Sequence, residues 1–300
     1  MNNGNIYAAT RETVEQIKAL SRWDSAAVAE VMAVNARIPS AAAGGRDSGG
    51  TIAVIPIAGF IEQRPSFFGA MFGGTSISSL TAAFRAAMND PGVKGIVFDV
   101  SSGGGSVFGV TELANEIRAA RGVKPIVSVV NSIAASAAYW LAASADEVVS
   151  TPSGIAGSIG VYAIHQDYSG AEEQAGIKTE IISAGEHKAD AVDGAPLSDA
   201  GRASMQAMVD HIYGTFVSDV AAGRGVSVAT VLADFGKGLT FTAPAAKTAG
   251  LVDRVATLDD TLKRLSTPQG RAAVMRAEYV EPVKDDGEAE RRIRRARVTI

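Results

Sequence analysis

Ser136 stands where an apolar run meets a stretch of small residues, VNSIAASAAYW (130–140). The pattern predicts a buried strand that turns into a helix at this serine. Backbone N–H groups at such a junction, including that of Ala137, can stabilise negative charge that develops beside the hydroxyl. A serine in this place is also a common helix cap. The residues alone therefore leave two roles open for Ser136, a nucleophile or an N-cap.

Three glycines follow another apolar run in DVSSGGGSVFG (99–109). Their backbone N–H groups, unobstructed by side chains, are suited to bind a phosphate or an oxyanion. The stretch has neither GxGxxG nor a final Lys-Ser or Lys-Thr, so it matches neither a dinucleotide site nor a P-loop. A plain tight turn from strand to helix is the alternative. A third small-residue stretch, GIAGSIGV (154–161), also follows a predicted strand, and open α/β sheets bind ligands at such strand ends.

The chain contains no cysteine and only three histidines, at positions 165, 187 and 211. Cysteine nucleophiles, disulfides and thiolate metal sites are excluded, and the histidine spacing does not match a zinc site. We therefore expect no metal and no cofactor, and any hydrolysis must use an oxygen nucleophile. The net charge of −4 and the pI near 5.5 create no basic field, so we expect no nucleic acid to bind the folded core.

The N-terminal stretch MNNGNIYAATRETVEQ lacks the basic and apolar regions of a secretory signal. The most apolar window, 126–145, is interrupted by Asn131 and several serines, and its pattern changes midway. It fits a strand followed by a helix better than a membrane span. We expect a cytoplasmic protein without a membrane partner.

Apolar runs alternate with helical patterns from residue 51 onward, which predicts an α/β fold with βαβ units and buried parallel strands. The expected strands are 51–57, 95–100, 125–130, 147–150 and 178–183. The expected helices are 76–89, 107–120, 134–144, 198–222, 227–234 and 243–249. The stretches that carry chemistry thus fall at the ends of strands.

Two appendages flank this domain, which we place at residues 50–265. Residues 1–49 combine a helical pattern over 11–37 with a linker, PSAAAGGRDSGG (39–50). Residues 266–300 lose the apolar periodicity and contain five arginines between 291 and 297. We expect an N-terminal helical arm and a charged, disordered C-terminal tail.

The order of these motifs resembles the signal peptide peptidase A family of serine peptidases. The glycine turn is followed by ASxxY, then by GSIGV, then by SAGEHKAD, over roughly residues 50 to 260. The tracts DYSGAEEQAGIKTEIISAGEHKAD and PLSDAGRASMQAMVDHIYGTFVSDVAAGRG most resemble the phage minor capsid proteases. The resemblance implies a ClpP/crotonase-like fold of repeated ββα/βαβ units and a serine–lysine dyad.

Matched position by position, the resemblance implies that Ser136 is the nucleophile and that Lys188 in AGEHKAD is the general base. A lysine acts as a base only if its pKa falls from about 10.4 toward neutrality, which burial among apolar groups can cause. Ser158 in GSIG is expected to hydrogen-bond this lysine and to orient it.

The same resemblance implies an oxyanion hole built from the N–H of Gly104 or Gly105 and that of Ala137. The family often has Gly-Gly after the nucleophile, where this chain has Ala137 and Ala138, and often Ser-Pro where it has Ser102 and Gly103. Alanine keeps the backbone donor, although its methyl groups could reshape the substrate pocket.

Other polar and aromatic residues have weaker claims to a catalytic role. His165 follows Ser136 by 29 residues and resembles the base of a Clp-type Ser-His-Asp peptidase, but no acid stands at a suitable downstream position. We favour Lys188 over His165. We expect Lys178 and His187 to face solvent. Core or structural roles are expected for Tyr139, Trp140, Pro56, Asp99 and Asp146.

The resemblance also implies the partners. The expected substrates are capsid or scaffold proteins cleaved during the assembly of a phage or prophage head, in the host cytoplasm or inside the prohead. An acyl-CoA enzyme of the crotonase fold and an inactive capsid protein are the alternatives. The expected assembly is a homo-oligomeric ring in which Ser136 of one subunit meets Lys188 of the next, so in one chain the two should lie beyond about 3.2 Å.

Overall fold

The structure, a computed structural model, describes residues 6–9, 46–47, 50–66, 69 and 73–276. Its centre is a sheet whose four main strands run parallel in the order β3-β5-β6-β7. The strands are β3 (Gly50–Glu62), β5 (Val93–Ser106), β6 (Ile126–Ala135) and β7 (Glu147–Ser150). All four strands expected in the first half of the domain are confirmed, and the α/β class is confirmed with them.

Short strands extend this sheet at its ends and edges. Near the end of β6, strand β8 runs parallel to it and β10 runs antiparallel to β8, while β11 pairs with β7. On the other side, β2 and β4 pair with β3, and β1 lies between β5 and β9. Their bounds are β1 (Ile6–Ala9), β2 (Arg46–Asp47), β4 (Thr75–Ser76), β8 (Ile155–Gly157), β9 (Tyr162–Ala163), β10 (Thr240–Thr242) and β11 (Arg254–Val255).

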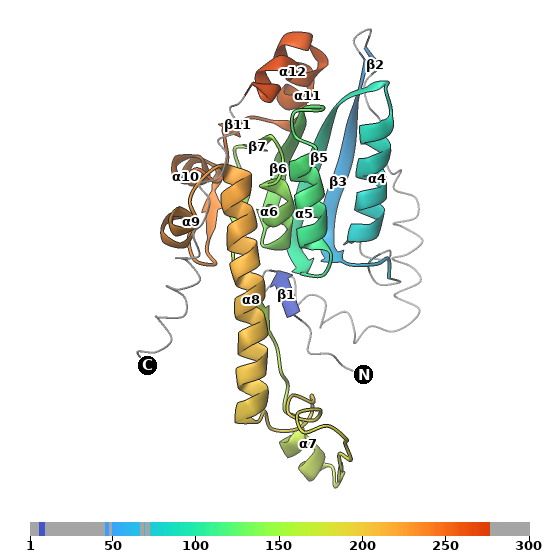
Figure 1. Cartoon of the computed structure of the whole chain (residues 1–300), viewed down its shortest axis with the longest axis vertical. Helices are drawn as coiled ribbons and strands as arrows, with labels where there is room; N and C mark the ends of the chain where they lie inside the picture. Colours follow the sequence, from blue (N-terminus) through green and yellow to red (C-terminus); the bar gives the residue numbers. More distant parts are fainter. Residues whose placement is uncertain (1–5, 10–45, 48–49, 67–68, 70–72, 277–300) are drawn as a thin grey trace.

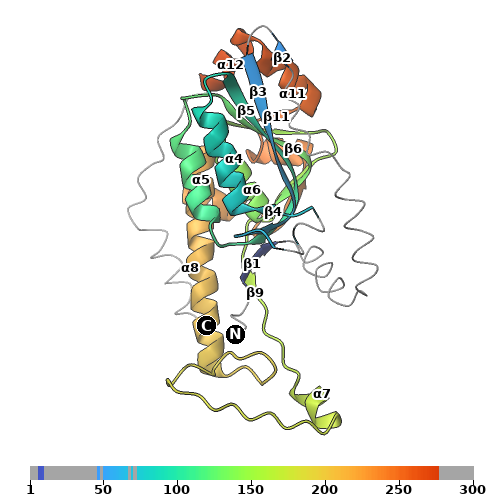
Figure 2. The ribbon, with the colours of Figure 1, turned by 90° about the vertical axis from the view of Figure 1, so that its right-hand side faces the viewer.

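Helices cover both faces of the sheet, because alternate side chains of each central strand point to opposite sides. Phe98 belongs to the larger apolar cluster, beneath α4 (Ile77–Asn89), α5 (Val110–Ala119) and α6 (Ala137–Ala142). Val97 belongs to a smaller cluster on the other face, closed by α11 (Leu258–Ser266) and α12 (Pro268–Met275). Figures 1 and 2 show these layers.

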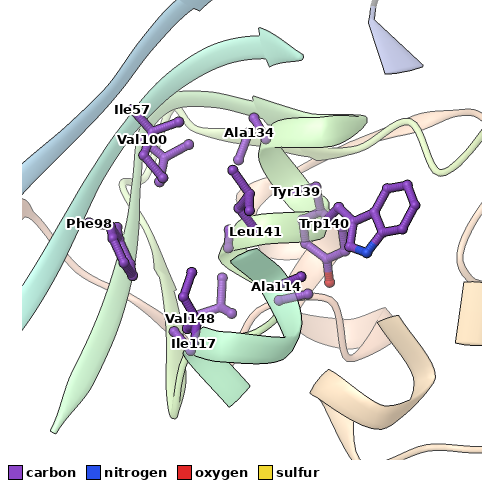
Figure 3. Close-up of a cluster of buried hydrophobic side chains, with 14 of the residues drawn as sticks. Ile57, Phe98, Val100, Ala114, Ile117, Ala134, Tyr139, Trp140, Leu141 and Val148 are labelled. Carbon is purple, nitrogen blue, oxygen red and sulfur yellow. The ribbon is translucent and has the colours of Figure 1, made fainter. Parts of the chain in front are cut away.

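Helix α6 is buried along its whole length, and its two aromatic residues anchor it to the rest of the core (Figure 3). The Trp140 ring stacks on Phe216 at 4.3 Å between ring centroids, and its indole N–H donates to Asp219 Oδ2 at 2.9 Å. The Tyr139 hydroxyl donates to the Leu251 carbonyl at 2.7 Å, and burial raises its pKa. The expected core role of both aromatic residues is confirmed.

A long extension leaves the sheet after β9. It contains α7 (Ser169–Gln174) and an irregular stretch, and it returns through α8 (Asp199–Arg224), whose 26 residues span about 39 Å. The C-terminal part of α8 packs on the core through residues such as Phe216 and Val220, whereas its other end carries the extension away from the sheet (Figure 1). The chain then forms α9 (Val228–Asp234) and α10 (Ala243–Ala249).

No single helix among the described residues is long and apolar enough to cross a membrane. Helices α8 and α9 meet that test of length and composition only as a pair, and they are bent by 104° at their junction.

Three expectations about local structure need correction. Residues 178–183 do not form a strand: they are exposed and pair with no other strand of the described chain, and an apolar run becomes a strand only where a partner exists. The glycine stretch is not a strand-to-helix turn, because β5 continues through it to Ser106. The tail does not begin at residue 266, because α12 follows. The predicted arm over 11–37 lies outside the described residues.

The last helix is part of the folded body. Val274 of α12 is only 2% exposed and packs in the same cluster as Leu265. The Arg271 guanidinium donates to the carbonyl of Leu265 at 2.8 Å, and Thr267 caps the helix by accepting from the N–H of Gly270 at 3.0 Å. The domain therefore continues to about residue 276 rather than ending at 265.

Two truncations test this boundary. A chain ending at Arg276 should keep the Tm of the full chain, whereas one ending at Leu265 exposes the surface that Val274 covers. Burial of such a side chain contributes about 1.5–3 kcal/mol, which corresponds to a drop of about 3–12 °C in Tm. Differential scanning calorimetry of both chains gives the comparison, and equal Tm values would show that α12 contributes nothing to the fold.

The Asp219 carboxylate accepts from the indole N–H of Trp140, and its Oδ1 lies 3.3 Å from the Arg118 guanidinium. Asp219→Ala leaves the buried indole N–H without its acceptor, which should cost about 1–3 kcal/mol in free energy of unfolding. Asp199→Ala, at the exposed start of the same helix, is the control and should cost less than about 1 kcal/mol. Denaturant unfolding measures both, and equal losses would contradict the anchoring role.

Candidate active site

Ser136 joins β6 to α6 with an unusual backbone conformation. Its φ is 56° and its ψ is −124°, a region that residues other than glycine rarely adopt and that costs about 1–3 kcal/mol. The strain is held from both sides, because its N–H donates to the Gly157 carbonyl at 2.8 Å and its carbonyl accepts from Trp140 N–H at 2.9 Å. Strained backbone of this kind is typical of functional sites.

The hydroxyl of Ser136 does not cap the helix that follows it. No side-chain cap hydrogen bond is formed, and Oγ instead lies 3.4 Å from the Gly160 carbonyl. The residue is 1% exposed and lies between Ala135 and Ala137, both fully buried. The helix-cap alternative for Ser136 is therefore wrong. The described hydrogen bonds of Ser136 involve no carboxylate.

The glycine stretch lies beside Ser136 because the parallel strands β5 and β6 bring it there. Ser102 pairs with Ala134 in the register of the two strands, so Gly104 and Ser136, each two residues further on, lie at the same end of the sheet. Gly105 has no room for a side chain, since a Cβ there would lie 2.0 Å from the Ile61 carbonyl oxygen. Close packing against β3 is thus one reason for a glycine at this position.

Ser102, to which the sequence analysis assigned no role, holds this stretch in place. Ser102 is buried, its hydroxyl donates to the Gly59 carbonyl at 2.6 Å, and its Oγ accepts from the N–H of Gly104 at 3.1 Å. The N–H of Gly104 is therefore engaged, and both glycines also face β1, with Gly105 opposite Ala8 and Gly104 opposite Ala9. The position of Ser102, two residues before a glycine pair, was the available signal for this role.

Ala137 is the first residue of α6, and its N–H has no acceptor within the helix because helical bonds run to the residue four positions earlier. This donor follows the nucleophile candidate directly. The glycine stretch lies at the same end of the sheet, so both are candidate donors to an oxygen that forms beside Ser136 Oγ.

Ser158 lies next to the residue that binds the backbone of Ser136. Strand β8 pairs with the end of β6, with Ala135 opposite Gly157, and Ser158 follows directly. Its φ is also positive, at 56°, and its N–H donates to the Leu239 carbonyl at 2.7 Å. The two serines thus share one end of the sheet, each in a strained conformation.

Lys188 lies in the irregular stretch between α7 and α8, and it is exposed. Its backbone N–H donates to the Gly185 carbonyl at 3.1 Å. Figures 1 and 2 show this stretch at the far end of α8, whereas α6 lies beside the other end of that helix. The described hydrogen bonds include none between the Lys188 amine and the Ser136 hydroxyl, so a single chain does not bring the expected dyad together.

His165 and His187 have partners of their own within the extension. His165 Nε2 lies 2.8 Å from the Ala195 carbonyl and its Nδ1 lies 3.5 Å from Asp193, so the ring joins the outgoing and returning segments. His187 is exposed and lies 2.8 Å from Asp190. None of their described contacts involves Ser136.

The other residues named from the sequence are either half-buried carboxylates or exposed at the surface. Burial raises the pKa of Asp99 and of Asp146, and Asp146 accepts from the N–H of Ile126 at 2.8 Å. Pro56 and Lys178 are exposed. No group of three His, Asp or Glu side chains in the described part of the chain is arranged to hold a metal ion.

Several known proteins resemble this chain over more than two thirds of its length. The model of peptidase family S49 matches residues 118–271, a range that contains Ser136, Ser158 and Lys188. The capsid assembly protease C of Escherichia phage lambda is 31% identical over 70% of this chain and 48% of its own length. The head-tail preconnector protein GP5 of Enterobacteria phage P21 is 31% identical over 72% of this chain and 43% of its own.

A cellular relative is Protease 4 of Salmonella typhi, 32% identical over 73% of this chain and 34% of its own length. The chain thus spans less than half the length of these three curated relatives. The expected resemblance to the signal peptide peptidase A family and to phage proteases is confirmed, and so is the ClpP-like α/β fold. With the match covering more than half of its residues, the chain belongs to peptidase family S49.

Proposed function

We propose that this chain is a serine endopeptidase with a Ser-Lys dyad that cleaves capsid or scaffold proteins during the assembly of a phage or prophage head. The observation that carries the proposal is the conformation of Ser136. This serine is buried and strained, and its hydroxyl does not cap the helix that begins after it. The names of the phage relatives, a capsid assembly protease and a head-tail preconnector protein, support this substrate class.

The chemistry proceeds by acyl transfer. The neutral amine of Lys188 takes the proton of Ser136 Oγ as the oxygen attacks a peptide carbonyl, and the lysine then gives that proton to the leaving amine. The carbonyl oxygen becomes an oxyanion that the N–H groups of Ala137 and of Gly105 or Gly104 stabilise. Water, deprotonated by the same lysine, releases the acyl group from the serine.

The base must come from a second subunit in this scheme. Lys188 is exposed in a single chain, and a lysine acts as a base only where another surface removes it from water. The extension carries Lys188 away from the Ser136 of its own chain, which suits contact with a neighbour. We infer a homo-oligomeric ring in which Ser136 of one subunit meets Lys188 of the next, with Ser158 orienting the amine.

Substitutions at the two residues test the dyad. Ser136→Ala and Lys188→Ala should each lower kcat/KM on a co-expressed capsid substrate by about 10³-fold or more, because each removes one half of a unit that acts together. Lys178→Ala, another exposed lysine of the extension, is the matched control and should keep the activity. An active Lys188→Ala protein would remove the lysine from the mechanism.

A fluorophosphonate probe, followed by gel fluorescence, separates the peptidase from an acyl-CoA enzyme and from an inactive capsid protein. The peptidase should be labelled at Ser136 and lose the label in Ser136→Ala. Lack of labelling in the assembled full chain would contradict a nucleophilic serine.

Mixing the two inactive proteins tests the shared site. Random rings of Ser136→Ala and Lys188→Ala subunits contain intact serine–lysine junctions at about a quarter of their interfaces, so activity should return in that proportion. A mixture of Ser136→Ala with the double variant is the control and should stay inactive. If subunit exchange is demonstrated by mass spectrometry and the first mixture also stays inactive, each subunit must use its own lysine.

A further inference from the structure

The chain places a piece of its own N-terminus at the end of the sheet that holds Ser136. Strand β1 lies between β5 and β9 and pairs antiparallel with both. Tyr7 is opposite Ser106 on one side and opposite Tyr162 on the other. Figure 2 shows β1 beside β9 at the point where the extension leaves the body.

This strand lies against the groups that surround the nucleophile. Ala8 is opposite Gly105 and Ala9 is opposite Gly104. On the other side, β9 begins two residues after Gly160, whose carbonyl lies 3.4 Å from Ser136 Oγ. The backbone of residues 6–9 therefore lies between the glycine stretch and the segment that follows Gly160, at the end of the sheet that holds Ser136.

Removal of β1 would leave two strand edges facing each other. The ends of β5 and β9 would then expose rows of backbone N–H and carbonyl groups, which form a template for another extended chain. Peptide recognition by addition of a strand uses edges of this kind and needs no particular side-chain sequence. A segment of the same chain competes well for such edges, because its tether raises its effective concentration over that of a separate peptide.

We propose that residues 6–9 are an internal inhibitory strand, which occupies the substrate groove between Gly104–Ser106 and Tyr162–Ala163 and must leave before a substrate strand can enter. The inhibitory role rests on the proposed peptidase function. The competition between residues 6–9 and a peptide for the groove can be measured by binding, without cleavage. Displacement of the N-terminal segment then switches the site from occupied to open.

The test measures binding in the full-length Ser136→Ala protein, which cannot cleave its ligand. The probe is a fluorescein-labelled peptide with the sequence of residues 2–11, NNGNIYAATR, followed by fluorescence anisotropy. The added substitutions Tyr7→Pro and Ala8→Pro remove two backbone donors and should free the groove, since proline cannot donate to a strand on either side. The probe should then bind at least about tenfold more tightly, because the open fraction no longer limits its affinity.

The control carries prolines at Asn2 and Asn3, outside β1, and should bind the probe as the parent does. Hydrogen exchange locates the site: amides of Gly104–Ser106 and Tyr162–Ala163 should exchange faster in the β1 variant and become protected again when the probe is added. Equal affinity in parent and β1 variant, an equal gain in the control, or protection only elsewhere would each overturn the proposal. Neither the binding measurement nor the exchange measurement depends on cleavage. If the protein that keeps Ser136 cleaves substrate but probe affinity is unchanged by the β1 substitutions, the inhibitory strand alone is refuted. If probe affinity rises but the protein that keeps Ser136 does not hydrolyse substrate, the peptidase function alone is refuted.

Discussion

The conformation of Ser136 depends on the burial of the short helix that follows it. Helix α6 has no exposed face: Tyr139 and Trp140 fill the core and satisfy their polar atoms on Leu251 and Asp219. A helix fixed on all sides cannot relax toward an ordinary cap, so the strain of the preceding residue persists at a cost that packing offsets. The parallel pairing of β5 with β6 then brings the glycine stretch to the same place. The site is thus a consequence of core packing rather than of local loop structure.

The two halves of the proposed dyad lie in very different environments. Ser136 is held within the rigid sheet, whereas Lys188 lies on an exposed extension that His165 ties together at its base through Ala195. A buried nucleophile gains from pre-organisation, whereas an exposed lysine needs a second surface to remove it from water before it can act as a base. In the proposed ring, this division would couple chemistry to assembly, because a neighbouring subunit would have to cover the base. A protease of head assembly would benefit from such coupling, since an unassembled subunit would be inactive.

Two strand edges, those of β5 and β9, lie at the end of the sheet that holds the site. Substrate strands would meet Gly104 and Gly105 on one side, where the lack of side chains permits close approach of another backbone. In the chain as it stands, β1 already fills that gap. Occupation by the chain's own segment protects an otherwise open pair of strand edges.

The sequence by itself determined the central strands, the main helices and the motif order that identifies the family, because the burial of each element is encoded in its own apolar period. It also singled out Ser136, Ser158 and the glycines, since these small residues follow apolar runs in the sequence. Tertiary structure decided what depends on a distant partner. The apolar run 178–183 resembles a strand, yet nothing in the described chain pairs with it, and α12 becomes part of the body only because Val274 meets Leu265. The choice between a capping and a strained serine at 136 likewise depended on Gly157 and on the buried helix, because local propensity cannot encode contacts that the fold brings together from far along the chain.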